Sequence, residues 1–327
     1  MPSTISRRDV LHAGTAASLA ALPLGVLAQA AWPSKPVRLV VPFAPGGSSE
    51  IVARAVAAEM AKTLGQNVFV ENKPGAAGVI GSDYVAKSPA DGSVLLLSSS
   101  TFVTAAVTQP RLPYDPLTAF VPVSMVGNGP MLLAVSAATP IKSAAELVAA
   151  AKAKPGSLTY GTSGTGSIAH LASEMLSDAA GIRMTHVPYK GAANALMDMA
   201  GGQIDMMISN YTSLVAQIKS GKVRALAVTS AQASPAFADL PPLSSVAPGF
   251  AADIWVTVFA PGNTPAPVVA RLNRELNQIA ASPEVKALLE PDGATPMALS
   301  PADLARRVRE DLAIWKKIAV EKKILAD

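Results

Sequence analysis

The chain has 327 residues, of which 50% are hydrophobic and 15% charged, and its net charge is +4. This length and apolar fraction suffice for a large core and for two domains. The lysines and arginines are spread along the chain, which argues against nucleic acid as a partner, and the lack of cysteine excludes disulfide and thiolate chemistry.

The N-terminal segment has the pattern of an export signal. Arg7 and Arg8 precede an apolar stretch at 13–28, and residues 28–30 read Ala-Gln-Ala, as at a cleavage site. The paired arginines are similar to those of twin-arginine signals, and the general secretory route stays open. A membrane anchor fits less well, because the run is short and interrupted by proline and glycine. We predict a signal at residues 1–30 and a soluble periplasmic protein after cleavage.

A strand, a turn and a helix follow the signal. Residues 37–41 form an apolar run typical of a strand buried on both faces, and apolar residues recur at helical spacing over 51–64. Two glycines between them permit a sharp turn, and Ser48 or Ser49 is predicted to cap the helix. A helix start favours an anionic guest, although geometry alone also explains these residues. The known nucleotide-binding loop patterns are absent.

Strand and helix patterns alternate along the rest of the chain, which is typical of α/β proteins. Further strands are predicted at 68–70, 94–97, 131–135, a segment ending at 160, 184–187, 204–208, 223–228 and 254–259. Further helices are predicted at 80–87, 144–153, 167–180, 192–200, 214–219, 267–281, 283–289 and 301–320. Ser143 precedes the helix at 144–153, and Ser282 and Ser300 are predicted to cap the helices at 283–289 and 301–320.

A second glycine- and serine-rich turn, at residues 161–167, leads into the helix predicted at 167–180. If both turns face one cleft, two helix starts converge on one anion. Charge-assisted hydrogen bonds contribute about 1.5–3 kcal/mol each, so four or five donors support micromolar binding without an arginine.

An enzymatic alternative rests on Ser163, which lies among glycines with His170 and His186 downstream. A serine hydrolase is the remote alternative, because the segment misses the last glycine of Gly-x-Ser-x-Gly and no acid is placed to orient a histidine. Two histidines without cysteine predict no metal site. We expect His170 in the first helical turn, near the ligand, and His186 in a structural role.

Two further polar residues follow predicted strands. Lys190 is the best-placed cation, although an ordinary solvated lysine is the simpler interpretation. Asn210 follows the strand at 204–208, at the edge where open α/β sheets bind ligands, and we predict that it hydrogen-bonds the ligand.

Taken together, these segments resemble the Bug-type extracytoplasmic solute receptors of the tripartite tricarboxylate transporter family. The resemblance covers the chain after the signal and is carried by VPFAPGGSSE, LGQNVFVENKPGAAGVIG, YGTSGTGSIAH, HVPYKG, GGQIDMMISN, GKVRALAVTS and ADIWVTVFAPGNTP. It implies an α/β, two-domain periplasmic binding protein fold with a hinge between the domains and the ligand cleft at their interface. Residues 31–131 plus 253–327 would form domain 1, and residues 132–252 domain 2.

The same resemblance implies a monomeric receptor that captures a small carboxylated solute and delivers it to membrane permease subunits. A dicarboxylate, an amino acid or an aromatic acid fits this class of ligand. The resemblance implies no cofactor, metal or catalysis. A protein read by a sensor kinase is the alternative, since it would use the same cleft.

The resemblance also indicates ligand-binding residues. On one side of the cleft these are Phe43, Gly46, Gly47, Ser48 and Ser49, and on the other Ser163, Gly164, Thr165, Gly166 and Ser167. Weaker candidates are Ser99, Ser100 and Thr101. Glu50 stands where the family usually has aspartate. Its longer side chain either supports the helix start or reaches into the cleft.

Overall fold

The computed structural model describes residues 32–324, and the predicted export signal lies outside these residues. From Lys35 onward the chain forms one compact unit. Among the described residues, no helix combines the length and the hydropathy that a membrane span requires.

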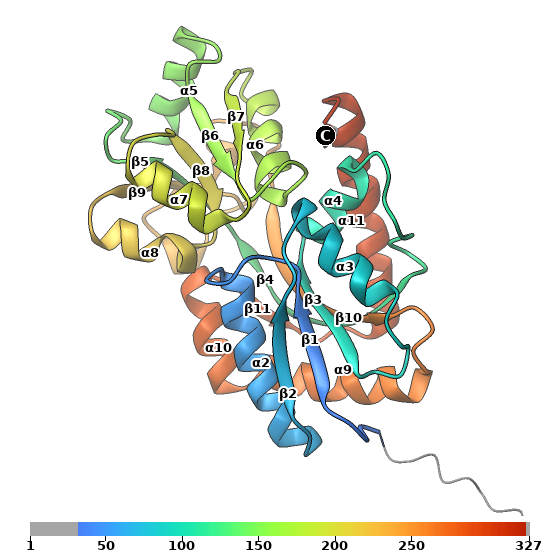
Figure 1. The fold of residues 1–327 in the computed structure, drawn as a ribbon. Coiled ribbons are helices and arrows are strands. Elements are labelled where there is room, and N and C mark those ends of the chain that lie inside the picture. The colour runs from blue at the N-terminus through green and yellow to red at the C-terminus, as the bar shows by residue number, and fades with distance from the viewer. Residues whose placement is uncertain (1–31, 325–327) are drawn as a thin grey trace, which may run out of the picture. The chain divides into compact units, whose positions relative to one another are not determined.

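The larger of two sheets has six strands in the order β11-β4-β10-β3-β1-β2 (Figure 1). These strands are β1 (Val37–Val41), β2 (Val68–Asn72), β3 (Val94–Ser99), β4 (Phe120–Pro130), β10 (Asp253–Pro261) and β11 (Thr295–Met297). β1 pairs in parallel with β2 and β3, whereas β10 runs antiparallel to β3 and β4. The sheet is therefore mixed, with the parallel strands toward one edge.

Helices cover the larger sheet in two groups (Figure 1). The first group is α2 (Ser48–Leu64), α9 (Ala266–Ala280) and α10 (Pro283–Leu289), and the second is α3 (Val79–Ala86), α4 (Thr101–Thr108) and α11 (Pro301–Glu321). Val37, Leu39, Val40 and Val41 of β1 are all inaccessible to solvent, as expected for a strand covered on both faces.

The smaller sheet has five strands in the order β7-β6-β8-β5-β9. Its strands are β5 (Leu132–Ser136), β6 (Thr159–Thr162), β7 (Thr185–Pro188), β8 (Met206–Ser209) and β9 (Val223–Val228). Its helices are α5 (Ala144–Ala153), α6 (Ile168–Ala179), α7 (Ala192–Ala200) and α8 (Tyr211–Lys219). Leu133 shares an apolar cluster with Leu171 of α6, whereas Leu132 shares another with Leu196 of α7. Because successive side chains of a strand point to opposite faces, β5 contributes apolar side chains to both faces of this sheet.

The chain passes between the sheets twice. β4 continues into β5 through Met131, and the return from β9 to β10 runs through the 3-10 turns η2 (Pro235–Phe237) and η3 (Leu243–Ser245). Two further 3-10 turns, η1 (Ala76–Gly78) and η4 (Glu290–Asp292), flank helices of the larger sheet. α6 also contacts α4 and α11, so both halves contribute to one apolar cluster.

Three elements were not predicted from the sequence: α4, β4 and β11. β4 contains two prolines and two glycines, which are depleted in strands. Its glycines serve close packing: a Cβ on Gly129 would lie 2.6 Å from the Cα of Ala294. The residues of α4, TFVTAAVT, are rich in β-branched types, which have lower helix propensity.

Some of the predicted helix caps are present in the structure, and one is not. Ser282 and Ser300 each accept a hydrogen bond from a backbone N–H in the first turn of the following helix, as predicted, and Ser143 caps α5 in the same way. The prediction that Ser48 or Ser49 caps α2 was wrong, because α2 begins at Ser48, and its N-cap is Gly47 without a side-chain cap. Gly46 N–H instead donates to Oε2 of Glu50 at 2.6 Å.

Candidate functional site

A cavity of about 140 Å³ is lined by residues from both sheets and their helices. It lies where β1, β3, β6 and β8 end and where five helices begin, namely α2, α4, α6, α7 and α8. Open α/β sheets bind ligands at this position, beyond the carboxyl ends of their strands. The arrangement makes this cavity the candidate ligand site.

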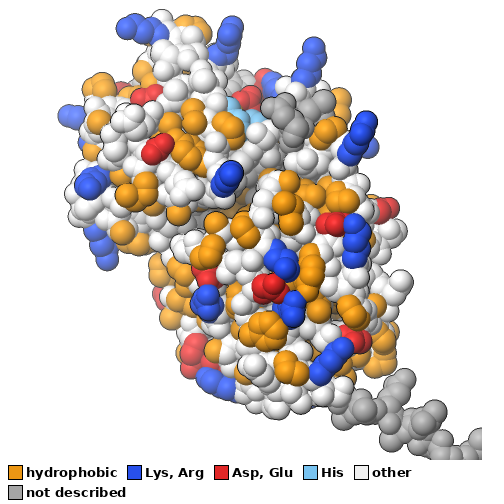
Figure 2. Space-filling view, in the orientation of Figure 1, with side chains coloured by type: hydrophobic (Ala, Val, Ile, Leu, Met, Phe, Trp, Pro, Cys, Tyr) orange, Lys and Arg blue, Asp and Glu red, His pale blue; other side chains and the backbone are white. Residues whose placement is uncertain are grey.

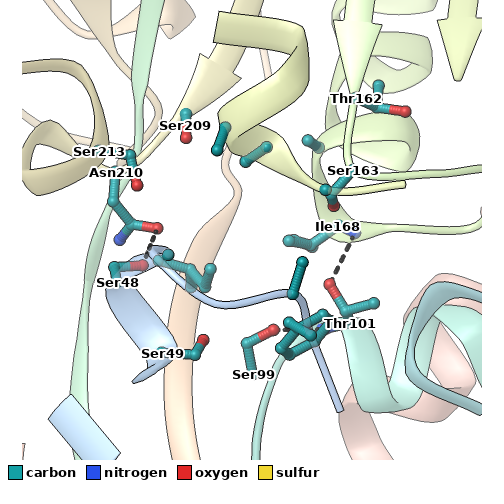
Figure 3. Close-up of a pocket in the computed structure, with 18 of the residues that line it drawn as sticks. Ser48, Ser49, Ser99, Thr101, Thr162, Ser163, Ile168, Ser209, Asn210 and Ser213 are labelled. Atoms are coloured by element: carbon teal, nitrogen blue, oxygen red, sulfur yellow. Dashed lines mark hydrogen bonds between the residues drawn. The ribbon is translucent and has the colours of Figure 1, made fainter. Parts of the chain in front are cut away.

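One end of the cavity, which we call the α2–α8 end, is formed by the starts of α2 and α8 (Figure 3). Ser48 Oγ donates to Asn210 Oδ1 at 3.3 Å, which joins the two halves of the protein there. Ser209 and Ser213 add hydroxyl groups beside Asn210. Apart from Glu50 in the first turn of α2, this end therefore presents uncharged hydrogen-bonding side chains.

The other end, the α4–α6 end, is formed by the starts of α4 and α6 (Figure 3). Ile168 N–H donates to Thr101 Oγ1 at 3.3 Å, a second bond between the halves. Thr162 and Ser163 lie beside it at the end of β6 and on the loop that follows. The predicted convergence of both glycine-rich turns on one cavity matches this geometry.

The start of α7 lines the same cavity with Gly191, Ala192, Ala193 and Asn194. Gly191 is its N-cap, no side chain caps the helix, and the first turn holds no acidic residue. The first backbone N–H groups of a helix have no intrahelical partner and carry partial positive charge. These residues were not among the predicted site residues, although Gly191 before the predicted helix at 192–200 was a signal for this helix start.

Glu50 is the one charged side chain that lines the cavity within the described part of the chain. Its Oε2 accepts from Gly46 N–H, and its Oε1 accepts from Arg54 Nε at 2.9 Å. The Gly46 N–H and the Arg54 guanidinium hold the pKa of this carboxyl below its usual value. Glu50 thus both supports the β1–α2 turn and lines the cavity, so it combines the two roles that the sequence left open.

The predicted site residues divide into two groups in the structure. Those that line the cavity are Phe43, Gly47, Ser48, Ser49, Glu50, Ser99, Thr101, Ser163 and Asn210. Those outside its lining are Gly46, Ser100, Gly164, Thr165, Gly166, Ser167, His170 and Lys190. Several of the second group shape the lining: Ser167 Oγ accepts from His170 N–H as the cap of α6, and Ser100 Oγ accepts from Trp255 N–H. Lys190 is exposed.

Polar lining residues that sequence analysis did not predict include Thr162, Ser209 and Ser213. The remaining wall is largely apolar and includes Met131 and Ile254, which lie at the two passages between the sheets. No sequence motif marks these residues, because their position depends on how the two halves meet.

His170 and His186 stack face to face behind the β6–α6 loop, with ring centroids 3.8 Å apart. Gly166 N–H donates to His170 Nδ1 at 3.1 Å, and Thr162 Oγ1 lies 2.7 Å from His186 Nε2. Burial lowers the pKa of His170 to about 3 and that of His186 to about 4. Both rings are therefore neutral near pH 7 and brace the loop. The described residues contain no group of three side chains suited to a metal ion.

Charged side chains elsewhere are scattered. On the face in Figure 2, lysines and arginines stand singly or beside acidic residues rather than in one basic patch.

Comparison with known proteins places these observations in a family. Residues 52–324 match the model of the tripartite tricarboxylate transporter family receptor. A protein encoded in the tcbD-tcbE intergenic region of Pseudomonas sp. strain P51 is 38% identical over 99% of this chain and 97% of its own length. BugT of Bordetella pertussis is 36% identical over 89% of this chain and 90% of its own length.

Solved structures share the fold. Rpa4515 of R. palustris with adipate is 36% identical, with a TM-score of 0.86 over 90% of this chain and 100% of that chain. MatC of Rhodopseudomonas palustris with bound malate is 32% identical, with a TM-score of 0.82 over 88% of this chain and 99% of that chain. The two-sheet arrangement is therefore the periplasmic binding protein fold predicted from the sequence.

Proposed function

Because the chain belongs to the tripartite tricarboxylate transporter receptor family, we propose that it is a periplasmic receptor that binds a small carboxylated solute in the cavity between its sheets and delivers it to a membrane permease. The observation that carries this proposal is the convergence of five helix starts on one cavity. The adipate and malate bound by two relatives support a carboxylate as the ligand.

The physical argument for an anion rests on backbone groups rather than on cationic side chains. No lysine, arginine or histidine lines the cavity in the part of the chain that the structure describes. A helix start stabilises a nearby negative charge by about 0.3–1 kcal/mol, and up to about 2 where it is partly buried. Together with hydroxyl donors, several such starts suffice for micromolar affinity, about 8 kcal/mol.

The proposal includes two domains that close on the solute. Residues 31–131 plus 253–327 would carry the larger sheet and residues 132–252 the smaller one, with the hinge at the two passages. The bonds of Ser48 to Asn210 and of Ile168 to Thr101 cross between these parts and would form on closure. A ligand that contacts both parts selects the closed state through its additional contacts.

A receptor role without catalysis is part of the proposal, as are a monomeric state and export to the periplasm. His170 and His186 direct their hydrogen bonds to Gly166 and Thr162 and not to Ser163, which disfavours a serine hydrolase. A permease and a sensor kinase would both bind the closed form, so a pull-down experiment with each candidate partner distinguishes these two roles.

The melting temperature of the protein, measured with mono-, di- and tricarboxylates, amino acids and aromatic acids, tests the function. A ligand present at 100 times its Kd adds roughly 2.7 kcal/mol of stability, which raises the melting temperature by several degrees. We expect a selective increase with one class of acid. No increase across the panel, with no acid found by mass spectrometry of the purified protein, would contradict the receptor function.

A further inference from the structure

The helix starts around the cavity differ in how far their donors are already used. At α2, Glu50 lies in the first turn, and its carboxylate accepts a hydrogen bond from the Gly46 N–H. At α8, Thr212 N–H donates to Asp292 Oδ1 at 2.6 Å, and Asp292 belongs to η4 in the half that carries the larger sheet. A carboxyl group therefore lies at each helix start of the α2–α8 end: Glu50 binds the N–H of Gly46, just before the N-cap of α2, and Asp292 binds an N–H in the first turn of α8.

The start of α7 differs from the starts of α2 and α8. It has no side-chain cap and no acid in its first turn, and its first residues, Ala192 to Asn194, line the cavity. At α6, by comparison, Ile168 N–H and His170 N–H already donate to hydroxyl oxygens. The free donors and the uncompensated partial charge of α7 make it the most favourable place for a carboxylate.

The α2–α8 end offers uncharged hydrogen-bonding groups instead. Ser209 is 7% exposed and lines the cavity, and its hydroxyl has no hydrogen-bond partner among residues 32–324. This hydroxyl is therefore available to a hydrogen-bonding group of the ligand. Asn210 and Ser48 add an amide and a second hydroxyl there.

A second carboxylate on the ligand would meet an unfavourable field at this end. Glu50 supplies a negative charge, and its counterion Arg54 lies outside the cavity lining, with 65% of its side chain exposed. Attraction to such a solvated guanidinium is screened by water, whereas the buried carboxylate at the cavity wall is screened less. Like charges placed together in a site destabilise the complex.

We propose, on the basis of the receptor function above, that the solute carries a single carboxylate bound at the start of α7 and an uncharged hydrogen-bonding group, such as an amide or hydroxyl, at the α2–α8 end. Dicarboxylates of the same length are discriminated against by Glu50. The inference concerns the class of solute within the same site.

Calorimetric titration of matched acids near pH 7.5 tests this inference. Each pair holds a dicarboxylate and its monoamide: succinate with succinamate, glutarate with glutaramate, and adipate with adipamate. We expect the monoamide of at least one pair to bind about tenfold or more tightly than the diacid, the factor that corresponds to about 1.4 kcal/mol. A diacid that binds as tightly as its monoamide in every pair would overturn the inference and leave the receptor function intact.

The variant Glu50→Gln identifies the residue responsible. Glutamine keeps an oxygen that accepts from Gly46 N–H but removes the charge, so the preference for the monoamide should fall severalfold. The melting temperature should fall modestly, because the charge-assisted bonds from Gly46 N–H and Arg54 are weakened. Glu59→Gln is the matched control, because Glu59 lies on the same helix, outside the cavity lining, beside Lys62. An unchanged preference in Glu50→Gln would overturn the role of Glu50. Absence of binding by all six acids would overturn the receptor function and this inference together.

Discussion

At the scale of single residues, the two histidines show how a polar side chain near a site can serve the loop rather than the ligand. His170 was predicted near the ligand, yet it is buried behind the lining, where it stacks on His186 and accepts from Gly166 N–H. Tyr160 lies beside this pair, with its ring centroid 5.0 Å from that of His186 and 6.2 Å from that of His170. These neutral rings hold the β6–α6 loop that places Ser163 at the cavity.

The histidine pair predicts a pH dependence of stability. In the unfolded chain each ring takes up a proton below about pH 6.5, but in the folded protein only near pH 3 for His170 and pH 4 for His186. Between these values the unfolded state binds more protons, so the free energy of unfolding falls as the pH is lowered from 6.5 toward 4. Each histidine contributes at most about 1.4 kcal/mol per pH unit.

Urea denaturation between pH 7 and pH 5 measures this slope. His186→Phe keeps an aromatic ring against His170 and Tyr160 but removes one titrating group, so the slope should fall by about half. A slope unchanged by this substitution would mean that other groups account for the pH dependence.

At the scale of elements, turns that place helix starts at the cavity depend on glycines with positive φ. Gly166, at φ +81°, is one of them: a Cβ there would lie 2.1 Å from Thr108 Oγ1, at the last residue of α4. The loop of the smaller sheet therefore approaches α4 so closely that a side chain at this position does not fit.

Gly166→Ala tests the importance of this approach against Gly156→Ala, which shares φ +81° but has no atom within 4 Å of its added Cβ. Both substitutions carry the strain of positive φ, about 1–2 kcal/mol. Only Gly166→Ala adds overpacking, typically about 1–3 kcal/mol, and displaces the loop of Ser163. We expect a larger loss of unfolding free energy and weaker solute binding in Gly166→Ala. Equal losses in urea denaturation would contradict the packing argument.

Sequence patterns predicted elements well where one local signal dominates. The buried run of β1 and the serine caps of α10 and α11 are such cases, and the structure confirms them. Patterns failed where tertiary contacts override propensity. The glycines of β4 weaken a strand pattern but make room for Ala294, just before β11, and for Leu289 of α10. The start of α7 was missed as a ligand contact because Gly191 is a helix start without a capping side chain.

At the scale of the whole described unit, the site is assembled from parts far apart in the chain. Ser48 meets Asn210 across 162 positions, and Ile168 meets Thr101 across 67. Local motifs identified the two glycine-rich turns, and the family resemblance brought them to one cleft. The apolar wall at Met131 and Ile254 and the position of Ser209 follow only from the way in which the halves meet.

The central claim is that this cavity holds the carboxylated solute. Ala193 tests it, since this residue lines the cavity from the first turn of α7 and its side chain is exposed rather than part of the core. The phenylalanine of Ala193→Phe would fill the space in front of the helix start with little effect on folding.

The decisive measurement is calorimetric titration of the acid that most raises the melting temperature, into the unaltered protein and into Ala193→Phe. We predict binding of one acid per chain in the unaltered protein and at least tenfold weaker binding in the variant, about 1.4 kcal/mol or more. Equal affinity in both proteins, with equal melting temperatures in the absence of ligand, would contradict the claim and place the solute elsewhere.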